Sequence, residues 1–273
     1  MPRFICETCG VQYPDSPTPP ASCPICLDER QYVGWHGQRW TTLDQMAAAG
    51  FRNVVREEEP GLLSVGTQPN FAIAQRALLV STPGGNILWD CVSFIDDDSV
   101  AAVRAAGGCD AIAVSHPHFY ASYVEWSEAF GGIPVYLHAA DRQWAVFDHP
   151  AVVFWEGEEI EPVPGLTLIR LGGHFDGAAV LHWPGGAEGR GAVLSGDTLQ
   201  VVMDRRYVSF MYSFPNLIPL SAATVADIAA RMRPYRYERI YGAWPGRVVT
   251  IEGPQSVERS AERCIRRLET RSG

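Results

Sequence analysis

Apolar runs of strand length recur along the chain from residue 61 onward, and segments with helical spacing lie between them. The runs occupy residues 62–66, 71–75, 77–81, 86–90, 110–114, 133–137, 166–171, 178–183, 191–194 and 239–241. Helices are expected at 99–106, 122–130, 221–232 and 255–268, and another is expected to begin near Ala139. The turn at residues 83–86 predicts that the runs on either side of it form a hairpin. Two β-rich halves with interspersed helices predict a layered α/β fold with polar residues gathered at one edge.

The first sixty residues follow a different pattern. Residues 1–30 contain two cysteine pairs and a proline-rich loop, and they are too few to bury a core of their own. Residues 31–60 contain tryptophans, a short expected helix and an acidic run, which favours a connector that packs on the main body. We therefore divide the chain into a four-cysteine knuckle (1–30), a connector (31–60) and a main domain (61–273).

The cysteine pairs have the spacing of a metal site. Cys6 and Cys9 form one C-x-x-C pair, Cys23 and Cys26 form the other, and four thiolates suit one tetrahedral ion. The segment resembles zinc ribbons, and its Cys-x-x-Cys-Gly and Cys-Pro-x-Cys knuckles also resemble those of rubredoxin, which holds iron. Because the ligands are identical, the sequence leaves zinc and iron open. With zinc, the site is expected to be structural.

Charge and composition narrow the class of partner. The chain has 273 residues and a formal net charge of −9, which argues against a nucleic acid bound through its phosphates. No apolar stretch is long enough to cross a membrane, and the N-terminus lacks the layout of a signal peptide. The seven cysteines are odd in number and clustered, as in proteins of reducing compartments. We expect a cytoplasmic protein that acts on a small molecule.

A second set of potential ligands lies at the ends of three expected strands. His116 and His118 follow the 110–114 strand and, in an extended segment, side chains two residues apart point to the same side. His174 follows the 166–171 strand, and Asp197 follows the 191–194 strand. Three imidazoles and a carboxylate suit zinc or iron.

This arrangement resembles the metallo-β-lactamase superfamily over roughly residues 61–253. The matching motifs are His116-x-His118, the Gly-His segment at His174 and the Ser-Gly-Asp-Thr segment at Asp197. The resemblance implies an αββα sandwich. It also implies that Asp90, at the end of the hairpin, supports the ligand loops through hydrogen bonds without binding the metal.

The departures from the superfamily pattern concern its second metal. Tyr120 and Ala121 stand where an aspartate and a histidine continue the motif, and residues 242–244 (Gly-Ala-Trp) stand where its last histidine is found. The ligands that belong to the second metal alone are therefore missing. The sequence predicts a site with one metal.

These features favour a mononuclear metal-dependent hydrolase with one zinc in the active site and one at the cysteines, iron being open at either. Such a metal lowers the pKa of a bound water. Either Asp197 orients that water, or Tyr120 supplies a polar contact to it. Aromatic residues near strand ends are candidates for a substrate-binding rim, chiefly Tyr212 and Trp244, together with Tyr207, Phe210, Met211 and Phe214.

Two other hypotheses remain. If His118 lies outside the metal's ligand set, then His116, His174 and Asp197 form a two-histidine, one-carboxylate face, which suits non-haem iron and an oxygenase resembling persulfide dioxygenases. The chain lacks the aspartate and histidine of that motif as well. Alternatively, the protein is a metal-stabilised scaffold without catalysis, and its ribbon binds a protein partner.

Overall fold

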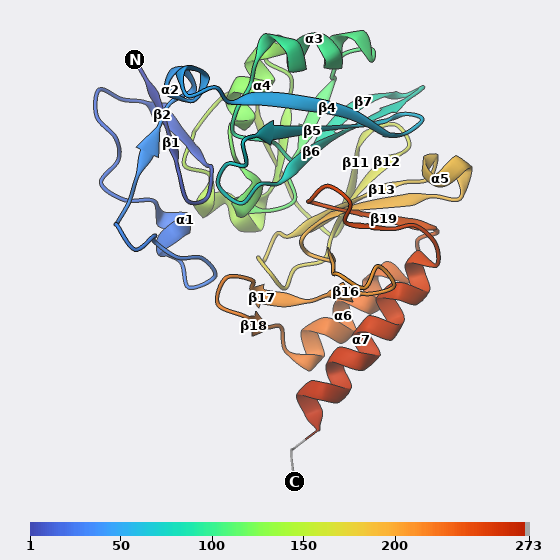
Figure 1. Ribbon diagram of the computed structural model, residues 1–273. Coiled ribbons are helices and arrows are strands. Elements are labelled where there is room, and N and C mark those ends of the chain that lie inside the picture. The colour runs from blue at the N-terminus through green and yellow to red at the C-terminus, as the bar shows by residue number, and fades with distance from the viewer. Residues whose placement is uncertain (271–273) are drawn as a thin grey trace.

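Two β-sheets lie face to face at the centre of the computed structural model, which describes residues 1–270 (Figure 1). The first sheet has seven strands in the order β10-β9-β8-β7-β6-β5-β4. Their bounds are β4 Arg52–Glu59, β5 Leu62–Gln68, β6 Arg76–Thr82, β7 Gly85–Trp89, β8 Ala111–Ala113, β9 Val135–His138 and β10 Val152–Trp155. Strands β4 to β7 pair antiparallel, and β7 to β10 pair parallel.

The second sheet has six strands in the order β11-β12-β13-β14-β19-β20. Their bounds are β11 Glu159–Val163, β12 Leu166–Arg170, β13 Ala179–Trp183, β14 Ala192–Gly196, β19 Arg239–Gly242 and β20 Val248–Val249. All neighbours pair antiparallel except β14 and β19, which are parallel. Two small hairpins lie between β14 and β19 along the chain: β15 Gln200–Val201 with β16 Val208–Ser209, and β17 Met211–Ser213 with β18 Ile218–Pro219.

Helices cover the outer faces of the sandwich. In Figure 1, α3 (Asp97–Ala105) and α4 (Tyr123–Ala129) lie with the first sheet, and α6 (Ala222–Met232) and α7 (Gly253–Glu269) lie with the second. Alternate residues of the strands face opposite layers. In β6, Leu78 and Val80 join the core between the sheets, whereas Ala77 and Leu79 join the core on the α4 side. The structure thus has the αββα layers expected from the sequence.

Local sequence signals set the helix boundaries. Asp96 and Ser99 form a reciprocal capping box at the start of α3, and the Ser221 hydroxyl accepts from the Thr224 N–H at the start of α6. The remaining short elements are α2 Leu43–Ala48, α5 Gly186–Gly189, and the 3₁₀ turns η1 Pro117–Phe119 and η2 Ala139–Trp144. Within residues 1–270, none of the helices combines the length and apolarity that crossing a bilayer requires.

The N-terminal ribbon is a three-stranded sheet in the order β2-β1-β3, with one short helix between β2 and β3 along the chain. It consists of β1 Arg3–Cys6, β2 Gln12–Asp15, α1 Pro24–Leu27 and β3 Trp40–Thr41. Its buried residues, including Cys6 and Val11, belong to the same hydrophobic cluster as Phe119 and Val124 of the main body. The apolar residues of the ribbon are therefore buried against the sandwich.

The structure differs from the sequence-based expectation in several strands. Outside the ribbon, β10, β11, β15 to β18 and β20 form where no strand was expected. Residues 52–59, which we assigned to the connector, form the edge strand β4 of the first sheet. Residues 71–75, expected as a strand, are not one, because Ala72 and Ala74 have φ values of 48° and 57°. A left-handed backbone at these two positions is incompatible with extended pairing. The hairpin across residues 83–86 is confirmed, with Ser81 opposite Asn86.

Candidate metal centre

The second group of expected ligands comes together at one end of the two sheets. His116 and His118 follow β8 of the first sheet, and the 3₁₀ turn η1 begins between them at Pro117. His174 follows β12, and Asp197 follows β14, both in the second sheet. Carboxyl ends of strands from both sheets thus meet at one point, as expected for polar residues at an α/β sheet edge.

The ligand atoms of these four residues all lie within 4.8 Å of one another. His174 Nε2 is 3.0 Å from His118 Nδ1, and His116 Nε2 is 3.2 Å from Asp197 Oδ1. His116 Nε2 and Asp197 Oδ1 are buried and have no hydrogen-bond partner in the described chain. Two polar atoms left in this state are costly unless a further group binds them.

Neighbouring groups fix the orientation of the imidazoles. His174 Nδ1 lies 3.0 Å from the Met211 carbonyl oxygen, which can only accept, so His174 Nδ1 carries the proton and Nε2 presents its lone pair to the cluster. His116 Nδ1 lies 3.0 Å from Ser115 Oγ. Each of these contacts leaves the inward-facing nitrogen available as a ligand.

Asp90, at the end of β7, holds the histidine loop from outside the cluster. Its Oδ1 accepts a hydrogen bond from the Ser115 N–H at 2.8 Å. Burial raises the pKa of the Asp90 carboxyl to about 7, although the bonds from Ser115 oppose that change. The structure thus gives Asp90 the kind of contact that the resemblance implied for it.

Burial favours the neutral forms of the ligands. It lowers the pKa of His116 and His118 well below the usual range for histidine and lowers that of His174 to about 4. It also raises the pKa of Asp197 well above the usual range, and the charge of Asp90 adds to this effect. Neutral imidazoles are the metal-binding form of histidine, and among residues 1–270 no lysine or arginine pairs with the Asp197 carboxylate.

These observations fit a divalent metal. Three neutral imidazole nitrogens and one carboxylate oxygen provide four donor atoms, and a cation among them would satisfy the buried atoms that have no partner. A bound cation would also reverse the effect of burial on Asp197 by favouring its ionised form. The arrangement includes His118, so it does not reproduce a two-histidine, one-carboxylate face.

Aromatic rings and one arginine surround the four ligands. Phe119 and Phe175 lie 4.8 Å and 5.5 Å from the His116 ring, and Phe214 lies 5.5 Å from that of His174. The Arg30 guanidinium lies over the Phe175 ring at 4.2 Å. Sequence reasoning missed Arg30, because it lies just after the cysteines and no pattern in the sequence connects it with the histidines.

The residues aligned with the second metal serve the packing of the chain. Tyr120 is buried, and its ring packs edge-on against Tyr123 rather than against one of the four ligands described above. Burial raises the pKa of the Tyr120 phenol well above its usual range. The Ala121 carbonyl accepts from the Gln12 N–H of the ribbon at 2.9 Å. The ribbon therefore contacts the main body where the superfamily pattern has a ligand.

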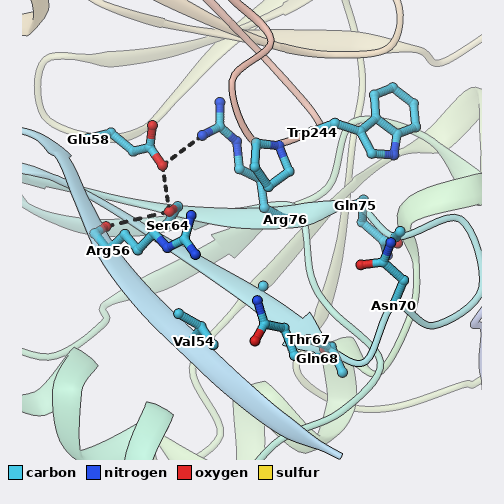
Figure 2. A pocket seen from close by; sticks show the side chains of 13 residues that line it. Val54, Arg56, Glu58, Ser64, Thr67, Gln68, Asn70, Gln75, Arg76 and Trp244 are labelled. Atoms are coloured by element: carbon cyan, nitrogen blue, oxygen red, sulfur yellow. Dashed lines mark hydrogen bonds and ion pairs between the residues drawn. The ribbon is translucent and has the colours of Figure 1, made fainter.

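The two expected rim residues lie on different sides of the centre. Tyr212 is beside His174, since it follows Met211 and its ring lies under the Arg30 guanidinium. Trp244 is separated from His116 by Phe119, whose ring centroid is 6.2 Å from that of Trp244. Trp244 borders a polar hollow over β4 to β6, shown in Figure 2, whose lining residues include none of the four ligands. Arg76, buried there, pairs with Glu58.

The four ribbon cysteines form a second compact cluster. Their sulfur atoms lie within 4.8 Å of one another, with Cys6 Sγ 3.5 Å from Cys26 Sγ and Cys9 Sγ 3.6 Å from Cys23 Sγ. Hydrogen bonds from Cys23 and Cys26 hold the pKa of Cys6 well below its usual range. The Gln38 side-chain amide also donates to Cys6 Sγ at 3.0 Å. Four buried sulfurs in this arrangement fit one tetrahedral ion.

Comparison with known proteins places the chain in a family. No family model matches the sequence. The protein YmaE of Bacillus subtilis strain 168, described as uncharacterised, is 48% identical over 269 residues, which cover 98% of this chain and 97% of YmaE. The chain belongs to the YmaE family. Because the similarity extends over nearly the whole length, it includes the ribbon and the main domain alike.

Solved structures identify the fold of this YmaE-family chain. TMB-1 superposes with a TM-score of 0.59 at 14% identity, covering 78% of this chain and 98% of TMB-1. The DIM-1 metallo-β-lactamase superposes with a TM-score of 0.58 at 13% identity, covering 78% and 98%. The FIM-1 metallo-β-lactamase from Pseudomonas aeruginosa, in its mono-zinc form, gives 0.55 at 15%, covering 78% and 96%. The chain has the metallo-β-lactamase fold.

Proposed function

We propose that the protein is a hydrolase with a single catalytic metal bound by His116, His118, His174 and Asp197. The observation that carries the proposal is the convergence of four buried ligand atoms, two of them without any other partner. The fold supports it, because the metallo-β-lactamase FIM-1 has this fold and has a mono-zinc form. We also propose zinc as the metal at both sites, with the cysteine-bound ion in a structural role.

Each residue of the centre has a defined part in this proposal. A divalent metal held by these four residues would need a fifth position, or the release of one ligand, to bind water; it would then supply Lewis acidity that lowers the pKa of that water and polarises the bond to be cleaved. The Met211 carbonyl keeps the proton of His174 on Nδ1, and burial keeps the imidazoles neutral. Asp197 is the only anion among the four ligands, and its carboxylate can accept a hydrogen bond from the attacking water and orient it.

A single metal is supported by what occupies the neighbouring positions. Tyr120 packs against Tyr123, Ala121 has no ligand atom in its side chain, and the Trp244 indole N–H donates to the Ile73 carbonyl. An indole N–H is a donor only and cannot bind a cation. A small-molecule substrate and a cytoplasmic location belong to the same proposal. The location is supported by the seven cysteines, none of which forms a disulfide.

Metal analysis of the His116→Ala variant tests this proposal. We expect about two metal equivalents in the parent protein and about one in the variant, because the cysteine site does not depend on His116. His182→Ala is the matched control, since its Nε2 bonds to the Arg236 carbonyl rather than to the centre. This control should retain both metals.

Turnover is measured on the same samples with a panel of chromogenic carboxylic esters, β-lactams and phosphodiesters. For a substrate that the parent cleaves, His116→Ala should lower kcat/KM by more than about 100-fold. Removing a residue that only hydrogen-bonds to a metal ligand usually has a smaller effect. Iron at the His/Asp centre would instead favour the oxygenase. A fully loaded parent that cleaves nothing in the panel would contradict the hydrolase and favour the scaffold.

A further inference from the structure

The segment that follows the last ribbon cysteine docks beside the His/Asp centre. The Ser213 hydroxyl donates to the Arg30 carbonyl at 3.0 Å. The Asn216 side-chain amide donates to the Glu29 and Gln31 carbonyls at 3.0 Å and 3.2 Å. The β17–β18 hairpin that provides these donors also provides the Met211 carbonyl bound by His174. The backbone at Arg30 is therefore fixed relative to His174 without help from the Arg30 side chain.

The Arg30 side chain is directed at the centre and is held there. Its guanidinium lies 4.2 Å from the Phe175 ring centroid and 5.2 Å from that of Tyr212. Nη1 donates to the His174 carbonyl at 3.4 Å, and Nε lies 2.8 Å from an Asp28 carboxylate oxygen. Rings on its faces and an acid at Nε restrict the guanidinium to one orientation.

Arg30 retains hydrogen-bonding capacity on the solvent side. Nη2 donates to no residue among 1–270, and it is not one of the fully buried polar atoms that lack a partner. The Arg30 side chain is 17% exposed, whereas those of His116 and Asp197 are 0% and 5% exposed. The guanidinium is therefore more accessible to solvent than His116 or Asp197.

The positive charge of Arg30 lies beside the centre, since its Nη1 donates to the His174 carbonyl. Asp28 offsets part of this charge at Nε. A divalent cation with the Asp197 carboxylate would leave one positive charge among the four ligands, which Asp90 opposes from outside the ligand set, so an anion would be favoured where it contacts both the cation and the Arg30 guanidinium.

We propose that Arg30 is a substrate-binding residue of the metal centre and that it selects substrates bearing an oxyanion, a carboxylate or a phosphonate, beside the bond to be cleaved. This inference rests on the proposed hydrolase. The planar guanidinium suits either group, because its parallel N–H donors match two oxygens of one anion. In this proposal the ribbon contributes directly to specificity, since it positions the residue that recognises the substrate.

Paired esters test the selection. The two substrates are the mono-para-nitrophenyl ester of fumaric acid, whose trans carboxylate cannot attack its own ester, and the methyl ester of that compound, which is neutral. Arg30→Gln should raise KM for the anionic ester about 10-fold or more, with kcat and the neutral ester changing little. Arg30→Lys should raise KM for the anionic ester less than Arg30→Gln does, because an ammonium keeps the positive charge but lacks the paired N–H donors of a guanidinium. Arg39→Gln, in an exposed ribbon ion pair with Glu7, is the matched control and should behave as the parent.

A binding measurement separates this inference from the hydrolase itself. Calorimetric titration of the metal-loaded protein with monomethyl succinate, and separately with methylphosphonate, requires no turnover. We expect at least one of the two anions to bind the parent and Arg39→Gln, and to bind Arg30→Gln about 10-fold more weakly. If neither ester is cleaved, the hydrolase proposal fails while the titration still decides the role of Arg30. The inference is overturned if Arg30→Gln binds the anions as the parent does, weakens both esters equally, or loses metal.

Discussion

Asp141, at the start of η2, is a buried acid whose ionisation opposes folding. It is 2% exposed, and its Oδ1 accepts from the Gly177 N–H at 2.9 Å. Its Oδ2 is buried without a hydrogen-bond partner in the described residues. Burial raises the pKa of Asp141 to about 6; the bond from Gly177 opposes that rise, and the charge of Asp176 adds to it.

The variant Asp141→Asn should therefore be more stable than the parent near neutral pH. The folded-state pKa lies above the unfolded one, so the charged form costs stability above the unfolded pKa, and that cost grows as pH rises from about 4 to about 6. The shift corresponds to roughly 3 kcal/mol at its plateau. Urea unfolding of both proteins at a series of pH values measures the difference. A difference that stays flat from pH 4 to pH 7 would contradict the raised pKa.

The residue scale also shows what the sequence could reveal of the site. His116, His118, His174 and Asp197 were predicted because strand ends and the spacing of the two histidines are local features, and the structure brings the four together. Arg30 was not predictable, since its position depends on hydrogen bonds from Ser213 and Asn216, far away in the chain. The prediction that Tyr120 acts in catalysis remains a prediction.

At the scale of elements, the centre requires the end of β14 to lie close to the loop after β8. Gly196 makes this possible, because a Cβ there would lie 2.8 Å from Ser115 Oγ, and because its φ is +55°. The next residue is Asp197, and Ser115 precedes His116. His116 and Asp197, which come from different sheets, therefore flank the contact between Ser115 and Gly196, and this contact has no room for a methyl group.

Gly196→Ala should weaken metal binding as well as the fold. The methyl group would push the β14 end away from Ser115, and overpacking of this kind costs about 1–3 kcal/mol. Gly189→Ala is the matched control, because its φ is +81° and its Cβ would have no neighbour within 4 Å. Gly189→Ala should lower the free energy of unfolding by about 1–2 kcal/mol, because alanine disfavours the left-handed backbone conformation, and it should leave metal affinity unchanged. Chelator competition and urea unfolding distinguish the two variants. Equal metal affinity would show that the close approach does not matter for binding.

Strand prediction succeeded where a strand contains an uninterrupted apolar run and failed where charged residues dominate, as in β4. The β6–β7 hairpin has a turn signal and apolar runs on both sides, and its register follows. Strand β4, in contrast, is an edge strand whose residues are mostly exposed or partly exposed and include three consecutive glutamates. Its charged residues interrupt the alternation that reveals a strand, although Val55 packs against the core, and charges suit an edge strand. Its place in the sheet comes from pairing with β5 rather than from its own pattern.

At the scale of the whole molecule, the ribbon and the sandwich share one hydrophobic cluster. Cys23 and Ile25 of the ribbon belong to the cluster that contains Phe119 and Tyr120 of the histidine loop. Polar contacts join the same two parts, since the Ser93 hydroxyl donates to the Gly10 carbonyl at 2.7 Å. The ribbon lacks enough apolar surface for a core of its own, so its metal and this shared cluster together stabilise it.

We therefore expect the ribbon and the main body to unfold as one cooperative unit. Cys23→Ser should remove one metal equivalent and lower the single melting temperature of the whole chain. A loss of about 3 kcal/mol or more, reasonable for a structural metal, corresponds to roughly 6 °C or more for a domain of this size. Cys264→Ser, a partly exposed cysteine of α7 outside both ligand clusters, is the matched control and should leave metal content unchanged. Differential scanning calorimetry distinguishes one cooperative unit from two independent ones. If the ribbon were an independent appendage, Cys23→Ser would leave the main transition at the parent's temperature, because the sandwich would lose nothing when the ribbon unfolds.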